Sequence, residues 1–152
     1  VLLDRGARRV YAVDVGRGQL AERLRTDARV VSMERLNART LDAGMLPEPM
    51  DLAVIDVSFI SLTRLLRGMV AHVLPGGDIL PMVKPQFELS PAQVPKGVVR
   101  DPAARAQAVA RVRDHARDLG LEVVAQSESV LVGPSGNHEF FLHLRVPAGS
   151  GA

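Results

Sequence analysis

The chain has 152 residues, and its 47% hydrophobic and 24% charged residues are typical of one folded domain rather than of a disordered chain. No apolar run approaches the roughly eighteen residues of a membrane helix, and the absence of cysteine excludes disulfides, thiolate nucleophiles and cysteine-based metal sites. Aromatic residues make up only 3%, which argues against a protein that grips single strands mainly by stacking bases.

Charge is uneven along the chain. Residues 1–39 hold nine arginines and five acidic residues, a local charge of +4, although the whole chain carries only +2. Such a basic segment suits an anionic partner such as a nucleic acid. A plain solvated surface is the alternative interpretation, because arginine outnumbers lysine seventeen to two over the whole chain.

The first half of the chain predicts strands and helices in alternation. The opening residues are typical of the end of a helix, and the first residue is Val1 rather than methionine, so we expect a longer natural protein. Apolar, β-branched runs predict strands over residues 9–15, 29–33 and 50–57. Apolar spacing predicts helices over residues 19–25 and 61–74, the second capped by Ser61 and ended by Pro75-Gly76-Gly77.

The second half continues this alternation and then changes it. A strand is expected over residues 78–83, and the proline-rich stretch 85–100 lacks periodicity, so we expect a loop. Asp101 caps the next helix, which runs to Leu119 and ends at Gly120. The last two strands are expected over residues 121–127 and 138–146, with a connection short enough for an antiparallel pair.

These elements predict an α/β fold. We expect a mostly parallel sheet covered on both faces, with a C-terminal antiparallel hairpin at its edge. One domain is expected over residues 1–146, followed by a flexible tail over residues 147–152. Ligands of such sheets bind at the carboxyl ends of the strands, so the residues that follow each strand are the candidates for a site.

The first two strands end close to polar residues. Asp14 ends the first strand, where a carboxylate can accept hydrogen bonds from the two hydroxyls of a ribose; a capping aspartate is the alternative. Asn37 follows the second strand, where its amide could recognise an adenine edge or simply form a turn.

Three ionisable side chains lie at the ends of the later strands. Asp56 ends the third strand, Lys84 ends the fourth, and Glu139 begins the last one. A carboxylate that ends an apolar strand is costly unless it is paired or placed at the mouth of the sheet. These groups predict a polar site there, and a purely structural salt bridge of Lys84 is the alternative.

Five segments carry a family resemblance, and they occur in this order: AVDVG, DLAVIDVSFIS, VKPQFE, VVRDP and GNHEFFLHL. Together they resemble the TlyA-type (haemolysin A) RNA methyltransferases, whose catalytic domain is similar to the FtsJ class. The resemblance covers the chain from Val1 to about Val146. It implies a Rossmann-like class I methyltransferase sheet and methyl transfer from S-adenosylmethionine to a ribose 2′-hydroxyl, of cytidine, in ribosomal RNA. It also implies a cytoplasmic protein with ribosomal RNA or ribosomal subunits as partners.

The resemblance assigns roles residue by residue. The family's catalytic tetrad is Lys-Asp-Lys-Glu, and its last three members fall on Asp56, Lys84 and Glu139. The cofactor is expected at Asp14, Asn37 and Asp56, and the chemistry needs no metal. The first lysine, the first strand and the glycine-rich cofactor loop have no counterpart in the chain and would precede Val1. A local departure also exists, since the segment PKGVVRD is shorter than its counterpart in the family.

RNA is expected to be held through its phosphates by basic side chains. The candidates are Arg8, Arg9, Arg17, Lys96 and Arg100. Lys84 could orient the ribose hydroxyl as a cation or accept its proton as a base, and the sequence leaves both roles open.

Two other functions compete with this one. A dinucleotide-binding oxidoreductase would need a GxGxxG motif, which the chain lacks. A non-catalytic RNA- or ribosome-binding relic is consistent with the missing lysine and glycine-rich loop. We expect the chain by itself to be a poor enzyme, because a missing central strand leaves a slot between unpaired strand edges.

Overall fold

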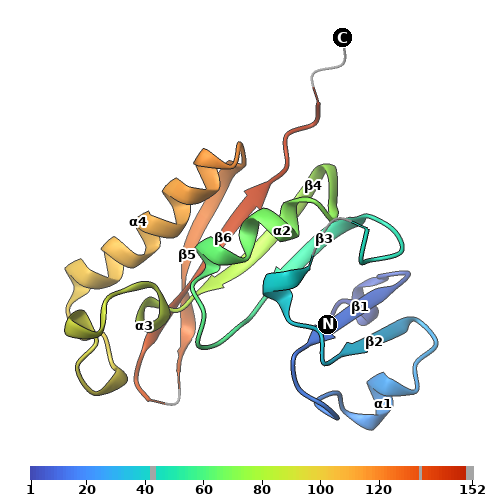
Figure 1. Ribbon diagram of the computed structural model, residues 1–152, viewed down its shortest axis with the longest axis horizontal. Helices are drawn as coiled ribbons and strands as arrows, with labels where there is room; N and C mark the ends of the chain where they lie inside the picture. The colour runs from blue at the N-terminus through green and yellow to red at the C-terminus, as the bar shows by residue number, and fades with distance from the viewer. Residues whose placement is uncertain (42–43, 134, 150–152) are drawn as a thin grey trace. The chain divides into compact units, whose positions relative to one another are not determined.

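The computed structural model describes residues 1–41, 44–133 and 135–149. It divides into two compact units, Val1–Asp42 and Ala43–Ala152. Each unit has its own sheet, and Figure 1 shows the course of the chain through both.

The first unit is built on a two-stranded parallel sheet of β1 and β2. The strands pair in register from Val10 opposite Val30 to Asp14 opposite Glu34, so both end in a carboxylate at the same edge. The elements of the unit are η1 (Leu3–Arg5), β1 (Val10–Asp14), α1 (Glu22–Arg25), β2 (Val30–Glu34) and η2 (Ala38–Thr40).

The second unit contains a four-stranded sheet in the order β3-β4-β6-β5. The β3–β4 pair is parallel, whereas the β4–β6 and β5–β6 pairs are antiparallel. Its strands are β3 (Met50–Ile55), β4 (Val73–Val83), β5 (Glu122–Val132) and β6 (His138–Arg145). Its helices are η3 (Leu62–Arg64), α2 (Leu66–Val70), α3 (Pro85–Glu88), η4 (Pro91–Gln93), η5 (Pro95–Gly97) and α4 (Pro102–Asp118).

The core of the second unit lies between the sheet and the helices α2 and α4, which lie over the same face of it (Figure 1). Asp101 caps α4 by accepting a hydrogen bond from the Ala103 N–H, and Pro102 occupies the first turn. One face of α4 is buried at Ala104, Ala108, Val109, Val112 and Ala116. The sheet contributes the buried side chains of Ile79, Val83, Leu142 and Leu144. This packing holds the central strands β4 and β6 rigidly beneath the helices.

The expected fold class and the antiparallel hairpin are confirmed. The expectation of a mostly parallel sheet is met only in part, since two of the four strand pairings among the described residues are antiparallel. β1 and β3 are each an end strand of their sheet in the described chain.

The helix predicted over residues 61–74 is wrong at its end, over residues 71–74. It divides into η3 and α2 and ends at Val70, because the segment after it turns back to pair with β3 and begins β4 at Val73. Gly76 and Gly77 form a bulge in β4 rather than the end of a helix: the Gly76 N–H donates to the Val146 carbonyl, and the Gly77 carbonyl accepts from the Val146 N–H. Gly76 has a φ of 82°, which a residue with a side chain rarely adopts. The predicted loop over residues 85–100 likewise contains short helical turns.

Candidate active site

The three ionisable residues predicted from the sequence meet at one end of the four-stranded sheet. Asp56 directly follows β3, and Lys84 directly follows the parallel neighbour β4. Glu139 is the second residue of β6, and the pairing of Val83 with Phe140 places Glu139 at the next register position, opposite Lys84. Three adjacent strands therefore bring these groups to a common edge.

Lys84 and Asp56 form an ion pair at this edge. The Lys84 Nζ lies 2.6 Å from the Asp56 Oδ1, and it also donates to the Ser58 Oγ at 3.3 Å. The lysine side chain is only 13% exposed, whereas that of Asp56 is 60% exposed. The ammonium is thus held firmly by β4 and the loop after β3, while the carboxylate stays open to a ligand.

Glu139 belongs to this edge without joining the ion pair. No ion pair connects it to Lys84 in the part of the chain that the structure describes. Its carboxylate lies beside Gly133, where an added Cβ would come 3.3 Å from the Glu139 Oε1. The half-buried Glu139 carboxylate therefore remains at this edge as a hydrogen-bond acceptor for a group other than Lys84.

An exposed aromatic ring lies on the same loop as Asp56. Phe59 is 91% exposed and has a φ of 65°, and its ring centroid lies 5.1 Å from that of Phe87. A bulky residue with a positive φ is strained, and strained residues concentrate at functional sites. The sequence showed Phe59 next to Asp56 but not its exposure, so it was not among the predicted site residues.

A buried asparagine fixes the loop that carries the two basic candidates of this unit. Asn137 is 4% exposed; its Oδ1 accepts from the Val99 N–H at 3.0 Å, and its Nδ2 donates to the Gly97 carbonyl at 2.9 Å. Lys96 and Arg100 flank these contacts and are exposed, and Lys96 has a φ of 54°. The loop is therefore held against the start of β6, two residues before Glu139.

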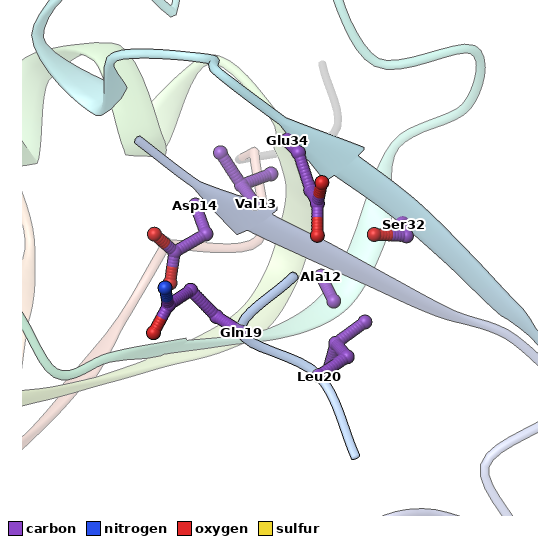
Figure 2. A pocket seen from close by; sticks show the side chains of 7 residues that line it. All are labelled: Ala12, Val13, Asp14, Gln19, Leu20, Ser32 and Glu34. Atoms are coloured by element: carbon purple, nitrogen blue, oxygen red, sulfur yellow. The ribbon is translucent and has the colours of Figure 1, made fainter. Parts of the chain in front are cut away.

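The first unit has a small hollow at the carboxyl ends of β1 and β2 (Figure 2). Asp14 and Glu34 hold the Gly16–Gly18 turn, because the Asp14 Oδ1 accepts from the Gly16 N–H and the Glu34 Oε1 from the Gly18 N–H, each at 2.6 Å. Asp14 is exposed, so its second oxygen stays available to a ligand. The residues lining the hollow are Ala12, Val13, Asp14, Gln19, Leu20, Ser32 and Glu34.

Sequence reasoning found Asp14 but missed Glu34. The signal was present, since Glu34 ends the second strand as Asp14 ends the first, but that strand was expected to stop at residue 33. Asn37 forms a turn: its Oδ1 accepts from the Arg39 N–H at 3.0 Å and caps η2. This bond engages the amide oxygen that an adenine edge would otherwise use.

The basic candidates of the first unit are on its surface. Arg8, Arg9 and Arg17 are exposed, and the Arg9 Nη1 lies 3.4 Å from the Tyr11 hydroxyl. Their distribution around η1, β1 and the turn after β1 does not by itself form one patch.

A second charged cluster lies at the middle of β4, where this strand pairs with the end of β6. The Asp78 Oδ1 lies 2.8 Å from the His143 Nε2 and 3.0 Å from the Arg145 Nε. The hydrogen bond from His143, followed by that from Arg145, holds the pKa of Asp78 below its ordinary value. This cluster ties β4 to β6 away from the Lys84–Asp56 pair.

Within the described residues, no group of three or more His, Cys, Asp or Glu side chains is arranged to hold a metal ion. A search of the same residues finds no helix with the length and apolar character needed to cross a membrane.

Comparison with known proteins identifies the family. The model of the FtsJ-like methyltransferases matches residues 1–146. The chain is 52% identical over 147 residues to the 16S/23S rRNA (cytidine-2′-O)-methyltransferase TlyA of Mycobacterium tuberculosis, covering 96% of this chain and 55% of that protein. It is 35% identical to Hemolysin A of Brachyspira hyodysenteriae, covering 95% of this chain and 61% of that one.

Solved structures agree with this result. A hemolysin candidate from Streptococcus thermophilus superimposes with a TM-score of 0.92 at 39% identity, over 96% of this chain and 54% of that one. An O-methyltransferase of Bacillus cereus in complex with SAH shares the fold, with a TM-score of 0.55 at 16% identity, over 90% of this chain and 62% of that one. The chain spans about half the length of the curated relatives it matches best in these comparisons. It belongs to the FtsJ-like methyltransferase family.

Proposed function

We propose that the chain is a catalytic domain of an S-adenosylmethionine-dependent RNA methyltransferase that modifies a ribose 2′-hydroxyl, of cytidine, in ribosomal RNA. The observation that carries the proposal is the ion pair of Lys84 and Asp56, with Glu139 at the opposite register position of the sheet edge. In this proposal Asp56, Lys84 and Glu139 take the roles that the family resemblance assigns to them. The names of its relatives supply the substrate class.

The chemistry asks these residues mainly to position reactants. S-adenosylmethionine supplies a methyl group on a positively charged sulfur when it is bound. Lys84 is paired with a carboxylate and mostly buried, so in this proposal it acts as an orienting cation that fixes the ribose oxygen. Asp56 stabilises the positive charge near the sulfur, and Glu139 accepts a hydrogen bond from the ribose. One C–O bond forms, one C–S bond breaks, and the hydroxyl proton leaves to water.

The cofactor residues fit a nucleoside. In the first unit, Asp14 keeps one oxygen free at the hollow, as the diol of a ribose would require, while its other oxygen holds the adjacent turn. Asn37 keeps its amide N–H₂ for an adenine acceptor, since its oxygen is engaged in the cap. In the second unit, Asp56 is the cofactor residue of this proposal. The complex of the Bacillus cereus enzyme with SAH supports the choice of cofactor.

The RNA would be bound through phosphates by the exposed basic residues of each unit. Those residues are Arg8, Arg9, Arg17, Lys96 and Arg100. Ribosomal RNA or a ribosomal subunit is the partner in this proposal, which places the reaction in the cytoplasm.

Binding of S-adenosylhomocysteine tests the cofactor assignment. We would titrate this chain by calorimetry beside a version extended upstream to the natural start. Binding by the extended version alone is the expected result, because the family resemblance implies a glycine-rich cofactor loop and the 152 residues contain no such segment. Failure of both versions to bind would overturn the cofactor assignment and favour the non-catalytic RNA-binding alternative.

Substitution of Lys84 tests the catalytic assignment. Lys84→Ala in the extended version should lower methyl transfer at least about 100-fold, because positioning of the nucleophile is lost. Incorporation of labelled methyl groups into ribosomal RNA measures this. Arg117→Ala, an exposed change on α4, is the matched control and should leave the rate unchanged. Undiminished transfer by Lys84→Ala would show the assignment to be wrong.

A further inference from the structure

A buried carboxylate lies four residues after Lys84 in the chain. Glu88, the last residue of α3, is only 2% exposed. Its Oε1 accepts from the Leu62 N–H at 2.8 Å, and its Oε2 accepts from the Ser61 hydroxyl at 2.5 Å. An ionised group in such a place is costly unless hydrogen bonds satisfy it, and here both oxygens have a donor.

These hydrogen bonds join the two loops that carry the ion pair. Ser61 and Leu62 lie on the segment that follows Asp56, and Glu88 lies four positions after Lys84. The same two segments therefore touch at the ion pair itself, at the Phe59–Phe87 ring contact and at the Glu88 carboxylate. Of these three contacts, that of Glu88 is the most buried.

Glu88 is itself fixed from the other side. The Arg111 Nη1 of α4 donates to the Glu88 carbonyl oxygen at 2.7 Å, which anchors the end of α3 on the long helix. The Ser61 hydroxyl also lies 2.7 Å from the Thr63 Oγ1 and accepts from the Thr63 N–H at 3.2 Å. Glu88 thus connects α4, through its backbone carbonyl, to the start of η3, through its carboxylate.

We infer that Glu88 is a positioning residue that sets the distance between the Lys84 ammonium and the Asp56 carboxylate. It acts by locking the loop after β3 to the loop after β4, and it does not touch the reactants. The inference rests on the proposed function for its catalytic meaning. Its structural part, which concerns how tightly Lys84 is held, can be tested on the chain without an activity assay.

The accessibility of the Lys84 ammonium can be measured by amine labelling, because Lys84 and Lys96 are the only lysines of the chain. Lys84 is 13% exposed and ion-paired, whereas Lys96 is exposed and serves as an internal reference. Trace labelling with an amine-reactive reagent, read by peptide mass spectrometry, gives the ratio of the two rates. In the unaltered chain Lys84 should react at least about tenfold more slowly, because labelling requires local opening.

Four variants separate positioning from general destabilisation. Glu88→Ala should raise the Lys84 to Lys96 ratio at least about fivefold, since the two loops then separate more often. Glu88→Gln should stay within about twofold of the unaltered chain, because an amide can still accept from Leu62 and donate to Ser61. Ser61→Ala, which removes one of the two bonds, should lie between them and replaces Glu88→Ala if that variant does not fold. Leu144→Ala, a cavity in the core on the half of β6 that pairs with Ile79, is the matched control and should leave the ratio unchanged.

Kinetics of the extended version give the second measurement. Glu88→Ala should lower kcat about tenfold with the cofactor KM changed less than about twofold, and Glu88→Gln should restore kcat. If the labelling ratio and the kcat of Glu88→Ala equal those of Leu144→Ala, the inference is overturned. If the extended version without any substitution shows no methyl transfer, while Glu88→Ala still changes the labelling ratio, the proposed function is refuted and the positioning role of Glu88 stands.

Discussion

Phe59 combines a bulky side chain with a left-handed backbone. The effect of its backbone strain can therefore be separated from the effect of its ring. Its φ of 65° costs about 1–2 kcal/mol for a residue with a Cβ, and glycine avoids that cost. The ring itself is 91% exposed and contacts Phe87. The strain belongs to the backbone, whereas any contact with a substrate belongs to the ring.

Phe59→Gly should therefore be more stable than Phe59→Ala by about 1 kcal/mol, although both lose the ring. Urea denaturation of the two variants measures the difference. If the ring contacts the substrate, both variants should show the same loss of methyl transfer in spite of their different stabilities. Equal stability of the two variants would argue against backbone strain at this position.

The Asp78 cluster makes the stability of the folded protein depend on pH in the acidic range. The pKa of Asp78 is held below its ordinary value, chiefly by the hydrogen bond from His143 and then by that from Arg145. A carboxylate with a lowered folded-state pKa stabilises the protein above its unfolded pKa of about 3.9, and that contribution is lost as pH falls through the folded pKa.

Asp78→Asn should therefore lower the melting temperature at pH 7 and reduce the loss of stability below about pH 4. Thermal melts of both proteins from pH 7 to pH 2 test this expectation. Asp118→Asn, on the exposed end of α4, is the control and should follow the unaltered chain. If the melting temperatures of Asp78→Asn and of the unaltered chain changed with pH in the same way, the expectation would be contradicted.

Residues at strand ends could be predicted from the sequence, and residues whose role depends on packing could not. Asp56, Lys84 and Glu139 follow from strand ends and from the family motifs, and the structure places them at one edge of the sheet. The role of Glu88 was not predicted, because a charged residue in a proline-rich stretch gives no sign that it will be 2% exposed. Burial and hydrogen-bond partners depend on segments that are distant in the sequence.

At the scale of elements, the loop between η5 and α4 is held by the buried side chain of Asn137, and Arg105 also donates to the Val99 and Arg100 carbonyls. Asn137 satisfies one backbone N–H and one backbone carbonyl of that loop, at Val99 and Gly97. This buried amide, whose two hydrogen bonds join residues 38 and 40 positions apart, acts as a cross-link between the loop and the start of β6.

Asn137→Ala should destabilise the second unit by about 2–4 kcal/mol, because each buried backbone group left without a partner costs about 1–3 kcal/mol. Chemical denaturation measures the loss. Hydrogen exchange should accelerate first at the Val99 amide, whose acceptor is removed. A loss below about 1 kcal/mol would mean that water or a neighbouring group replaces the asparagine.

The bounds of the elements show where local patterns stop being sufficient. The helix over residues 102–119 was predicted almost to the residue, because its cap, its first-turn proline and its terminal glycine are all local signals. The start of β4 was missed by five residues, since Val73 becomes a strand residue only by pairing with Met50. Gly76 and Gly77 are typical of a turn, but long-range pairing with Val146 places them in a bulge.

At the scale of the whole molecule, the two units differ in how much core they have. In the first unit, no described side chain before Leu41 is buried, and the sheet has two strands. The second unit buries one face of its four-stranded sheet under α2 and α4. A small sheet with little buried surface is marginally stable.

Native-state hydrogen exchange should therefore distinguish the units. Amides of β1 and β2 should exchange at least about tenfold faster than those of β4 and β6, because opening of the first unit exposes less apolar surface. Mass spectrometry of peptic fragments resolves the two regions. Equal protection of both sheets would show that the chain unfolds as one cooperative unit.

The position of Lys84 on the central strand also bears on how the site is assembled during folding. The Lys84–Ser58 and Glu88–Leu62 contacts each join residues 26 apart, whereas the contact of Asp78 with Arg145 joins residues 67 apart. The entropy of loop closure grows with the logarithm of length, so the longer closure costs about 0.8 kcal/mol more. The parallel β3–β4 half, with the ion pair and its buried carboxylate, is thus favoured to form before β6 docks. In this order Glu139, on β6, joins the sheet edge after the Lys84–Asp56 ion pair has formed.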